Sequence, residues 1–107
     1  MNGRTVLITG ASSGIGEATA TRLAAMGAHV VLVSRTAKRG EKARDRIRRA
    51  HPGASLDLLI ADLATGAQVR ALADAFKAKY SRLDVLLPTD SRATLARLAQ
   101  MILTREL

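Results

Sequence analysis

The chain of 107 residues contains no cysteine, which excludes disulfides, thiolate metal sites and cysteine nucleophiles. Only Phe76 and Tyr80 are aromatic, so a packed core has to be built from Leu, Ile, Val and Ala. His29 and His51 have no carboxylate or thiol cluster beside them in the sequence, and no metal site is expected. No run of about 18 apolar residues occurs, and the first apolar run is too short for a signal peptide. The sequence therefore favours a cytoplasmic protein without a membrane span.

Charge is plentiful but uneven along the chain. Seventeen Lys and Arg against nine Asp and Glu give a net charge of +8. Residues 35–49 hold eight basic and two acidic residues, so most of the excess lies in this segment. Such a helix can be a solvated outer helix, can steer a phosphorylated ligand, or can contact nucleic acid. Nucleic acid is the least favoured of the three, because no stacking aromatic accompanies the charge.

Apolar runs alternate with helical patterns along most of the chain. Residues 5–9, 30–33, 56–61 and 83–87 read as strands, and the first two are apolar on both faces, as in a parallel sheet. Helices are expected between these strands and over residues 90–104, where Asp90 or Ser91 would cap the last helix. The apolar stripes assigned to the first and third helices are Ile15, Ala18, Leu23 and Met26, and Val69, Leu72, Ala73, Phe76 and Tyr80. This pattern predicts an α/β, three-layer, Rossmann-like fold with a parallel sheet of four strands, order 3-2-1-4, and flanking helices.

A glycine-rich loop joins the first strand to the first helix. Its sequence from Gly10 to Gly16 is G-A-S-S-G-I-G. Gly10 suits a tight exit from the strand, Gly14 lets the backbone approach a bulky anion, and Gly16 allows close packing of helix and strand. Amide groups at the helix start would then face a pyrophosphate. The residues expected to bind it are Gly10, Ser12, Ser13, Gly14, Ile15 and Gly16.

The segment Thr9–Gly16 resembles the nucleotide loop of the short-chain dehydrogenase/reductase family, and the resemblance runs from about residue 4 to residue 87. In that family an acidic residue at the end of the second strand selects NAD. Here Ser34 and Arg35 stand at that point, and an Arg fork can hold a 2′-phosphate, so the resemblance implies NADP in preference to NAD. It also places Asp62 and Leu63 beside the adenine. Asp62 could instead cap the helix that begins near residue 65.

The resemblance fails where the fourth strand ends. The family continues into Asn-Asn-Ala-Gly, whereas residues 86–90 read Leu-Leu-Pro-Thr-Asp. The family's catalytic Ser and its Tyr-x-x-x-Lys pair are missing, because Tyr80 has Asp84 four residues later and is interpreted as core packing. No catalytic residue is expected. The chain is thus read as one dinucleotide-binding domain over residues 1–107, truncated, with a divergent C-terminal helix over 88–107.

Three functional hypotheses remain open. The first is an NADP(H)-binding half-domain that has no activity by itself. The second is an oxidoreductase that works only when a partner chain supplies the Tyr-Lys pair. The third is a small basic interaction or nucleic-acid-binding module. The exposed apolar edge at residues 83–87 favours self-association through that strand and helix 90–104, although the helix could instead fold back onto its own sheet.

Overall fold

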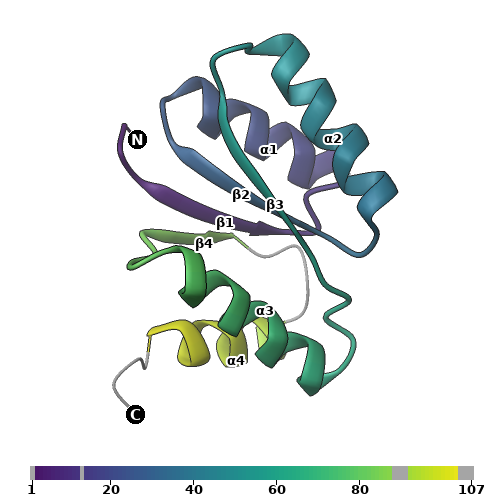
Figure 1. Ribbon diagram of the computed structural model, residues 1–107, viewed down its shortest axis with the longest axis vertical. Helices are drawn as coiled ribbons and strands as arrows, with labels where there is room; N and C mark the ends of the chain where they lie inside the picture. The colour runs from purple at the N-terminus through teal and green to yellow at the C-terminus, as the bar shows by residue number, and fades with distance from the viewer. Residues whose placement is uncertain (1, 13, 88–91, 104–107) are drawn as a thin grey trace.

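The computed structural model describes residues 2–12, 14–87 and 92–103. Four parallel strands form one sheet in the order β3-β2-β1-β4, which confirms the predicted fold class. Helices α1 and α2 cover one face of the sheet and helices α3 and α4 cover the other (Figure 1). The elements in chain order are β1 (Thr5–Thr9), α1 (Gly14–Ala25), β2 (His29–Ser34), α2 (Ala37–Ala50), β3 (Ser55–Ile60), α3 (Gly66–Lys79), β4 (Val85–Leu87) and α4 (Arg92–Leu103).

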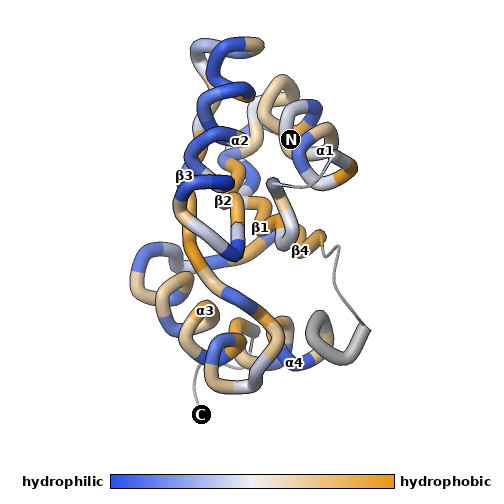
Figure 2. Tube along the Cα trace, turned by 90° about the vertical axis from the view of Figure 1, so that its right-hand side faces the viewer, coloured by the Kyte–Doolittle hydropathy of each residue, from blue (hydrophilic) through white to orange (hydrophobic). Residues whose placement is uncertain are grey.

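The core has two halves, one on each side of the sheet. Successive residues of a strand point to opposite faces, so Val6 and Ile8 pack toward α1 and α2 while Leu7 packs toward α3 and α4. All three side chains are buried. Figure 2 shows hydrophobic residues along β1 and β2 and mostly hydrophilic residues along α2. Burial on both faces explains why these strands read as continuous apolar runs.

The packing face of α1 differs from the predicted stripe. Ile15 and Met26 are 79% and 57% exposed, and the buried residues of the helix are Gly16, Ala20 and Ala24. These three follow one another at intervals of four, which places them on one side of the helix. Leu23 of the predicted stripe does pack against the core, but Ile15, Ala18 and Met26 are exposed, because the helix packs mainly through its smallest side chains, which allow it to approach β1 closely.

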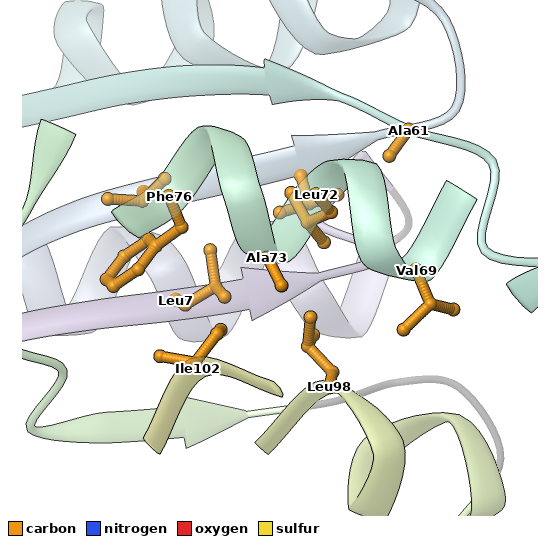
Figure 3. Close-up of a cluster of buried hydrophobic side chains, with 10 residues drawn as sticks. Leu7, Ala61, Val69, Leu72, Ala73, Phe76, Leu98 and Ile102 are labelled. Carbon is orange, nitrogen blue, oxygen red and sulfur yellow. The ribbon is translucent and has the colours of Figure 1, made fainter. Parts of the chain in front are cut away.

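Helix α4 folds back onto its own chain. Leu98 and Ile102 are buried against α3 and the sheet, and both point toward Leu7 and the α3 side chains (Figure 3). Lys77 Nζ donates a hydrogen bond of 2.8 Å to the carbonyl oxygen of Met101. The position of α4 therefore agrees with the alternative in which the last helix folds back onto its own sheet. The expected caps Asp90 and Ser91 lie outside the described residues, as does the divergent sequence at 88–90.

Two further observations bear on function. Among the described residues, no helix has the length and apolar character needed to cross a membrane. Within the same part of the chain, no group of three or more His, Asp and Glu side chains is placed to hold a metal ion.

Candidate functional site

The glycine loop lies at the carboxyl end of β1, between Thr9 and the start of α1 at Gly14. Gly10 has φ +65°, a conformation that side-chain-bearing residues rarely adopt. The amide of Ala11 donates a hydrogen bond of 3.1 Å to the carbonyl oxygen of Val33, which ties the loop to β2. A Cβ atom at residue 16 would lie 2.3 Å from the carbonyl oxygen of Gly10. Gly10 and Gly16 are therefore explained by the fold itself, as the sequence predicts.

Gly14 has no such internal explanation. Apart from its chain neighbours and the nearby backbone of its own helix, no heavy atom of the described residues lies within 4 Å of the position that its Cβ would take. Gly14 is also the first residue of α1, where backbone N–H groups lack acceptors within the helix and the dipole favours negative charge. The neighbouring side chain of Ile15 is largely exposed. The space beside the start of α1 is therefore open, and the positive end of the helix dipole faces it. Such a space suits an anion from outside the protein. The predicted contact Ser13 lies outside the described residues.

At the end of β2, Ser34 is turned into the protein. It is 2% exposed, and its hydroxyl lies 3.0 Å from the carbonyl oxygen of Thr36 and 3.3 Å from Ser12 Oγ in the glycine loop. Ser34 therefore connects the end of β2 to the glycine loop. Because this position holds a serine, it carries no carboxylate. Arg35 follows it and is exposed. Thr36 caps α2, because its side chain accepts from the amide of Arg39.

At the end of β3, Asp62 is exposed and Leu63 is half-buried against the core. Asp62 Oδ1 accepts a hydrogen bond of 3.2 Å from the amide of Ala64. The alternative reading of Asp62 as the cap of α3 was wrong, because Thr65 takes that position and accepts from the amide of Gln68. The carboxyl ends of parallel strands share one edge of the sheet, so the structure brings the glycine loop, Arg35 and Asp62 to the same edge.

A second polar cluster, which the sequence did not reveal, lies at the opposite edge. Tyr80 does pack its ring against Phe76, with ring centroids 4.9 Å apart, but it is only half-buried. Its hydroxyl donates a hydrogen bond of 2.5 Å to Asp57 Oδ2 and lies 2.9 Å from His29 Nε2. The interpretation of Tyr80 as core packing was therefore incomplete. The cluster could be found only from the register between β2 and β3, which places His29 opposite Ser55.

Two groups in this cluster have shifted pKa values. Burial and the hydrogen bond and charge of Asp57 raise the pKa of the Tyr80 phenol. Partial burial raises the pKa of Asp57, but hydrogen bonds from Tyr80, the Leu58 amide and Lys79 outweigh it, so the pKa of Asp57 is lowered overall. Asp57 is thus a carboxylate, and Tyr80 a neutral phenol, at neutral pH.

Comparison with known proteins gives the chain its family. A model of the short chain dehydrogenase family matches residues 4–101. The chain is 45% identical over 87 residues to human dehydrogenase/reductase SDR family member 13, which is 81% of this chain and 23% of that protein. It is 40% identical over 100 residues to human retinol dehydrogenase 14, covering 81% of this chain and 30% of that protein. The chain thus spans less than a third of the length of these relatives.

Solved structures agree with this assignment. The Pseudomonas aeruginosa RhlG/NADP active-site complex has a TM-score of 0.85 at 27% identity, covering 96% of this chain and 46% of that chain. A metagenomic short-chain oxidoreductase in complex with NADP has a TM-score of 0.72 at 34% identity, covering 80% of this chain and 38% of that chain. The order of strands, the glycine loop and these likenesses together lead to one conclusion. The chain belongs to the short-chain dehydrogenase/reductase family.

Proposed function

We propose that this chain binds NADP(H) and that the 107 residues carry out no hydride transfer by themselves. Gly14 carries the proposal, because the space beside it is open while the fold accounts for the other two glycines of the loop. In the bound state the pyrophosphate lies at the start of α1, held by backbone amides and favoured by the helix dipole. Ser12 and Ile15 flank this position, and Ser13, which lies outside the described residues, belongs to the proposed site by sequence alone. By family resemblance Asp62 and Leu63 flank the adenine.

Preference for NADP is the second part of the proposal. A carboxylate at the end of β2 would bind the ribose diol of NAD and repel a 2′-phosphate. Ser34 stands there instead, with its hydroxyl turned to Ser12 and Thr36, and the exposed Arg35 follows. Arg35 can donate paired, charge-assisted hydrogen bonds to a 2′-phosphate. The NADP complexes of two similar proteins add support.

The absence of turnover is the third part. When bound, the cofactor would supply a hydride donor or acceptor for the reaction. The sequence of these 107 residues has no Tyr-x-x-x-Lys pair to move a proton to or from a carbonyl substrate. The residues present therefore fit the adenosine and pyrophosphate half of the cofactor. We do not expect them to carry out by themselves the substrate chemistry of a full-length relative.

Calorimetric titration with NADP, NAD and 2′,5′-ADP tests the binding. We expect NADP and 2′,5′-ADP to bind and NAD to bind more weakly. Gly14→Val should weaken NADP binding by at least about tenfold, because its side chain fills the space that the phosphate needs and removes an interaction of about 1.5 kcal/mol or more. Gly53→Val is the matched control, since Gly53 also has open space around its Cβ position but precedes β3 at the opposite edge. Equal or tighter binding of NAD would refute the cofactor choice.

Self-association through β4 is a separate proposal. Among the described residues β4 pairs with β1 alone, so its outer edge can accept another strand. Half-buried Leu83, Leu86 and Leu87 lie along this segment. Sedimentation velocity over a range of concentrations tests the proposal. A concentration-dependent dimer supports it, and a single monomeric species at high concentration contradicts it.

A further inference from the structure

Four side chains at the amino-terminal edge of the sheet form one continuous chain of hydrogen bonds. Ser55 Oγ lies 2.5 Å from His29 Nδ1, and His29 Nε2 lies 2.9 Å from the hydroxyl oxygen of Tyr80. The Tyr80 hydroxyl in turn lies 2.5 Å from Asp57 Oδ2. His29 and Ser55 are the first residues of β2 and β3, whereas the glycine loop follows the last residue of β1. The cluster is therefore separate from the proposed cofactor site.

The direction of every hydrogen bond in this chain follows from the charge of Asp57. An ionised carboxylate only accepts, so the Tyr80 hydroxyl donates to Asp57. The phenol oxygen of Tyr80 must then accept the proton carried by His29 Nε2. In the neutral form of His29 the imidazole carries one N–H, so with that proton on Nε2 the Nδ1 atom is bare and accepts the hydroxyl proton of Ser55. These hydrogen bonds favour one tautomer of His29. In that tautomer the basic nitrogen Nδ1 faces the hydroxyl of Ser55.

The order of groups is that of an activated nucleophile: a serine, a histidine base, and further groups that hold the base in one tautomer. The Tyr80 hydroxyl stands between the base and the carboxylate here. Lys79 Nζ lies 3.2 Å from Asp57 Oδ2 and offsets part of its charge. Ser55 is exposed at the start of its strand, so a reagent can reach its hydroxyl from solvent.

We propose that Ser55 is a nucleophilic serine that takes an acyl group from small activated esters, with His29 as the general base and Tyr80 as a positioning residue. Ser55 Oγ forms a bond to the carbonyl carbon of the ester, and its proton passes to His29 Nδ1. The bond from that carbon to the leaving oxygen breaks, and the leaving group departs with the electron pair. The imidazolium proton neutralises the leaving group, and the product is O-acyl Ser55. The step needs no oxidant or reductant.

Acetylation by p-nitrophenyl acetate tests the proposal on the full chain, with peptide mapping by mass spectrometry to locate each acetyl group. Ser81, which is also exposed, is the internal reference. We expect Ser55 to be acetylated about 10²-fold faster than Ser81, and His29→Gln to slow acetylation of Ser55 by about the same factor, the effect of losing a general base. His51→Gln, the same substitution at the other histidine, should change nothing at Ser55.

Tyr80→Phe separates positioning from packing. The variant keeps a ring against Phe76 and removes only the hydroxyl, so acetylation of Ser55 should fall less than in His29→Gln. Nitrogen NMR of the unmodified chain gives an independent measurement that needs no variant. We expect His29 to carry its proton on Nε2, and Tyr80→Phe to populate both tautomers.

Three results would overturn the proposal. The first is that Ser55 is acetylated no faster than Ser81. The second is that the acetylation rate of Ser55 is the same in His29→Gln as in the unmodified chain. The third is that His29 carries its proton on Nδ1 in the unmodified chain. A network that serves stability alone would lower the free energy of unfolding in these variants while leaving acetylation of Ser55 equal to that of Ser81.

Discussion

The carbonyl oxygen of Gly10 occupies the space that a side chain at residue 16 would need. A Cβ atom there would lie 2.3 Å from this oxygen and 3.0 Å from its carbonyl carbon. Both atoms belong to the backbone of a loop that Ala11 ties to β2, so moving them aside is more costly than moving the end of a flexible side chain. The close approach of α1 to the end of β1 therefore depends on the missing side chain of Gly16.

Gly16→Ala is expected to lower the free energy of unfolding by about 1–3 kcal/mol, the usual cost of forcing extra atoms into a packed position. Urea unfolding monitored by circular dichroism measures it. Gly14→Ala is the matched control, because its added methyl meets open space and helix propensity favours alanine. It should leave the free energy of unfolding equal or slightly higher. Equal destabilisation by both variants would contradict the packing described for Gly16.

Arg35 is expected to decide between the two dinucleotides. Arg35→Gln removes a charge-assisted contact worth about 1.5–3 kcal/mol, so binding of NADP should weaken by about 10- to 100-fold while binding of NAD hardly changes. Calorimetric titration of each nucleotide measures both effects. Arg49→Gln in the last turn of α2 is the control, because it removes the same charge at the far end of the helix that follows Arg35. A similar loss in Arg49→Gln would mean that the field of the whole basic segment, not Arg35, selects NADP.

Much of the fold could be predicted from the sequence because its central strands are buried on both faces. The predicted strand at 5–9 has the observed bounds of β1, and the predicted strand at 30–33 differs from β2 by one residue at each end. Strands near the edges are less continuous in their apolar pattern, and β4 begins at Val85, two residues after the predicted start. The predicted glycine roles at residues 10 and 16 are confirmed by a positive φ and a close backbone contact.

The face of α1 and the cluster at His29 could not be predicted for two different reasons. Helix α1 packs through Gly16, Ala20 and Ala24, and such small residues add little to an apolar periodicity. His29 and Ser55 lie 26 residues apart and meet only because of the register between β2 and β3. A pattern search along one segment does not see a pair that forms across two strands.

Asp84 begins the pairing of the last strand with the first. The amide of Thr5 donates to Asp84 Oδ2 at 2.8 Å, and the amide of Asp84 donates to the carbonyl oxygen of Thr5 at 3.0 Å. The hydrogen bond from Thr5 is the main cause that lowers the pKa of Asp84, with Arg82 and Arg4 adding to it against the effect of burial. Because the folded pKa is the lower one, this stabilisation is complete above about pH 4 and is lost as pH falls through the folded pKa.

Asp84→Asn should therefore flatten the acid side of the stability profile. The unmodified chain is expected to lose unfolding free energy as pH falls from about 4, and the variant should lose less, because its side chain carries no charge to titrate. Thermal unfolding over this pH range measures the difference. Asp57 also has a lowered pKa, so some slope should remain. Asp74→Asn, at an exposed position on α3, is the control and should keep the slope of the unmodified chain.

Leu98 should carry much of the attachment of α4 to the rest of the fold. Its side chain is 1% exposed within the cluster that contains Leu72 and Phe76, so Leu98→Ala removes buried atoms and leaves a cavity. We expect the free energy of unfolding to fall by about 2–5 kcal/mol in urea unfolding. Gln100→Ala, at an exposed position of the same helix, should change it by no more than about 0.5 kcal/mol. If Leu98→Ala is as mild as Gln100→Ala, α4 does not pack on α3 in solution, and the apolar face of α3 would then be free for a second copy of the chain.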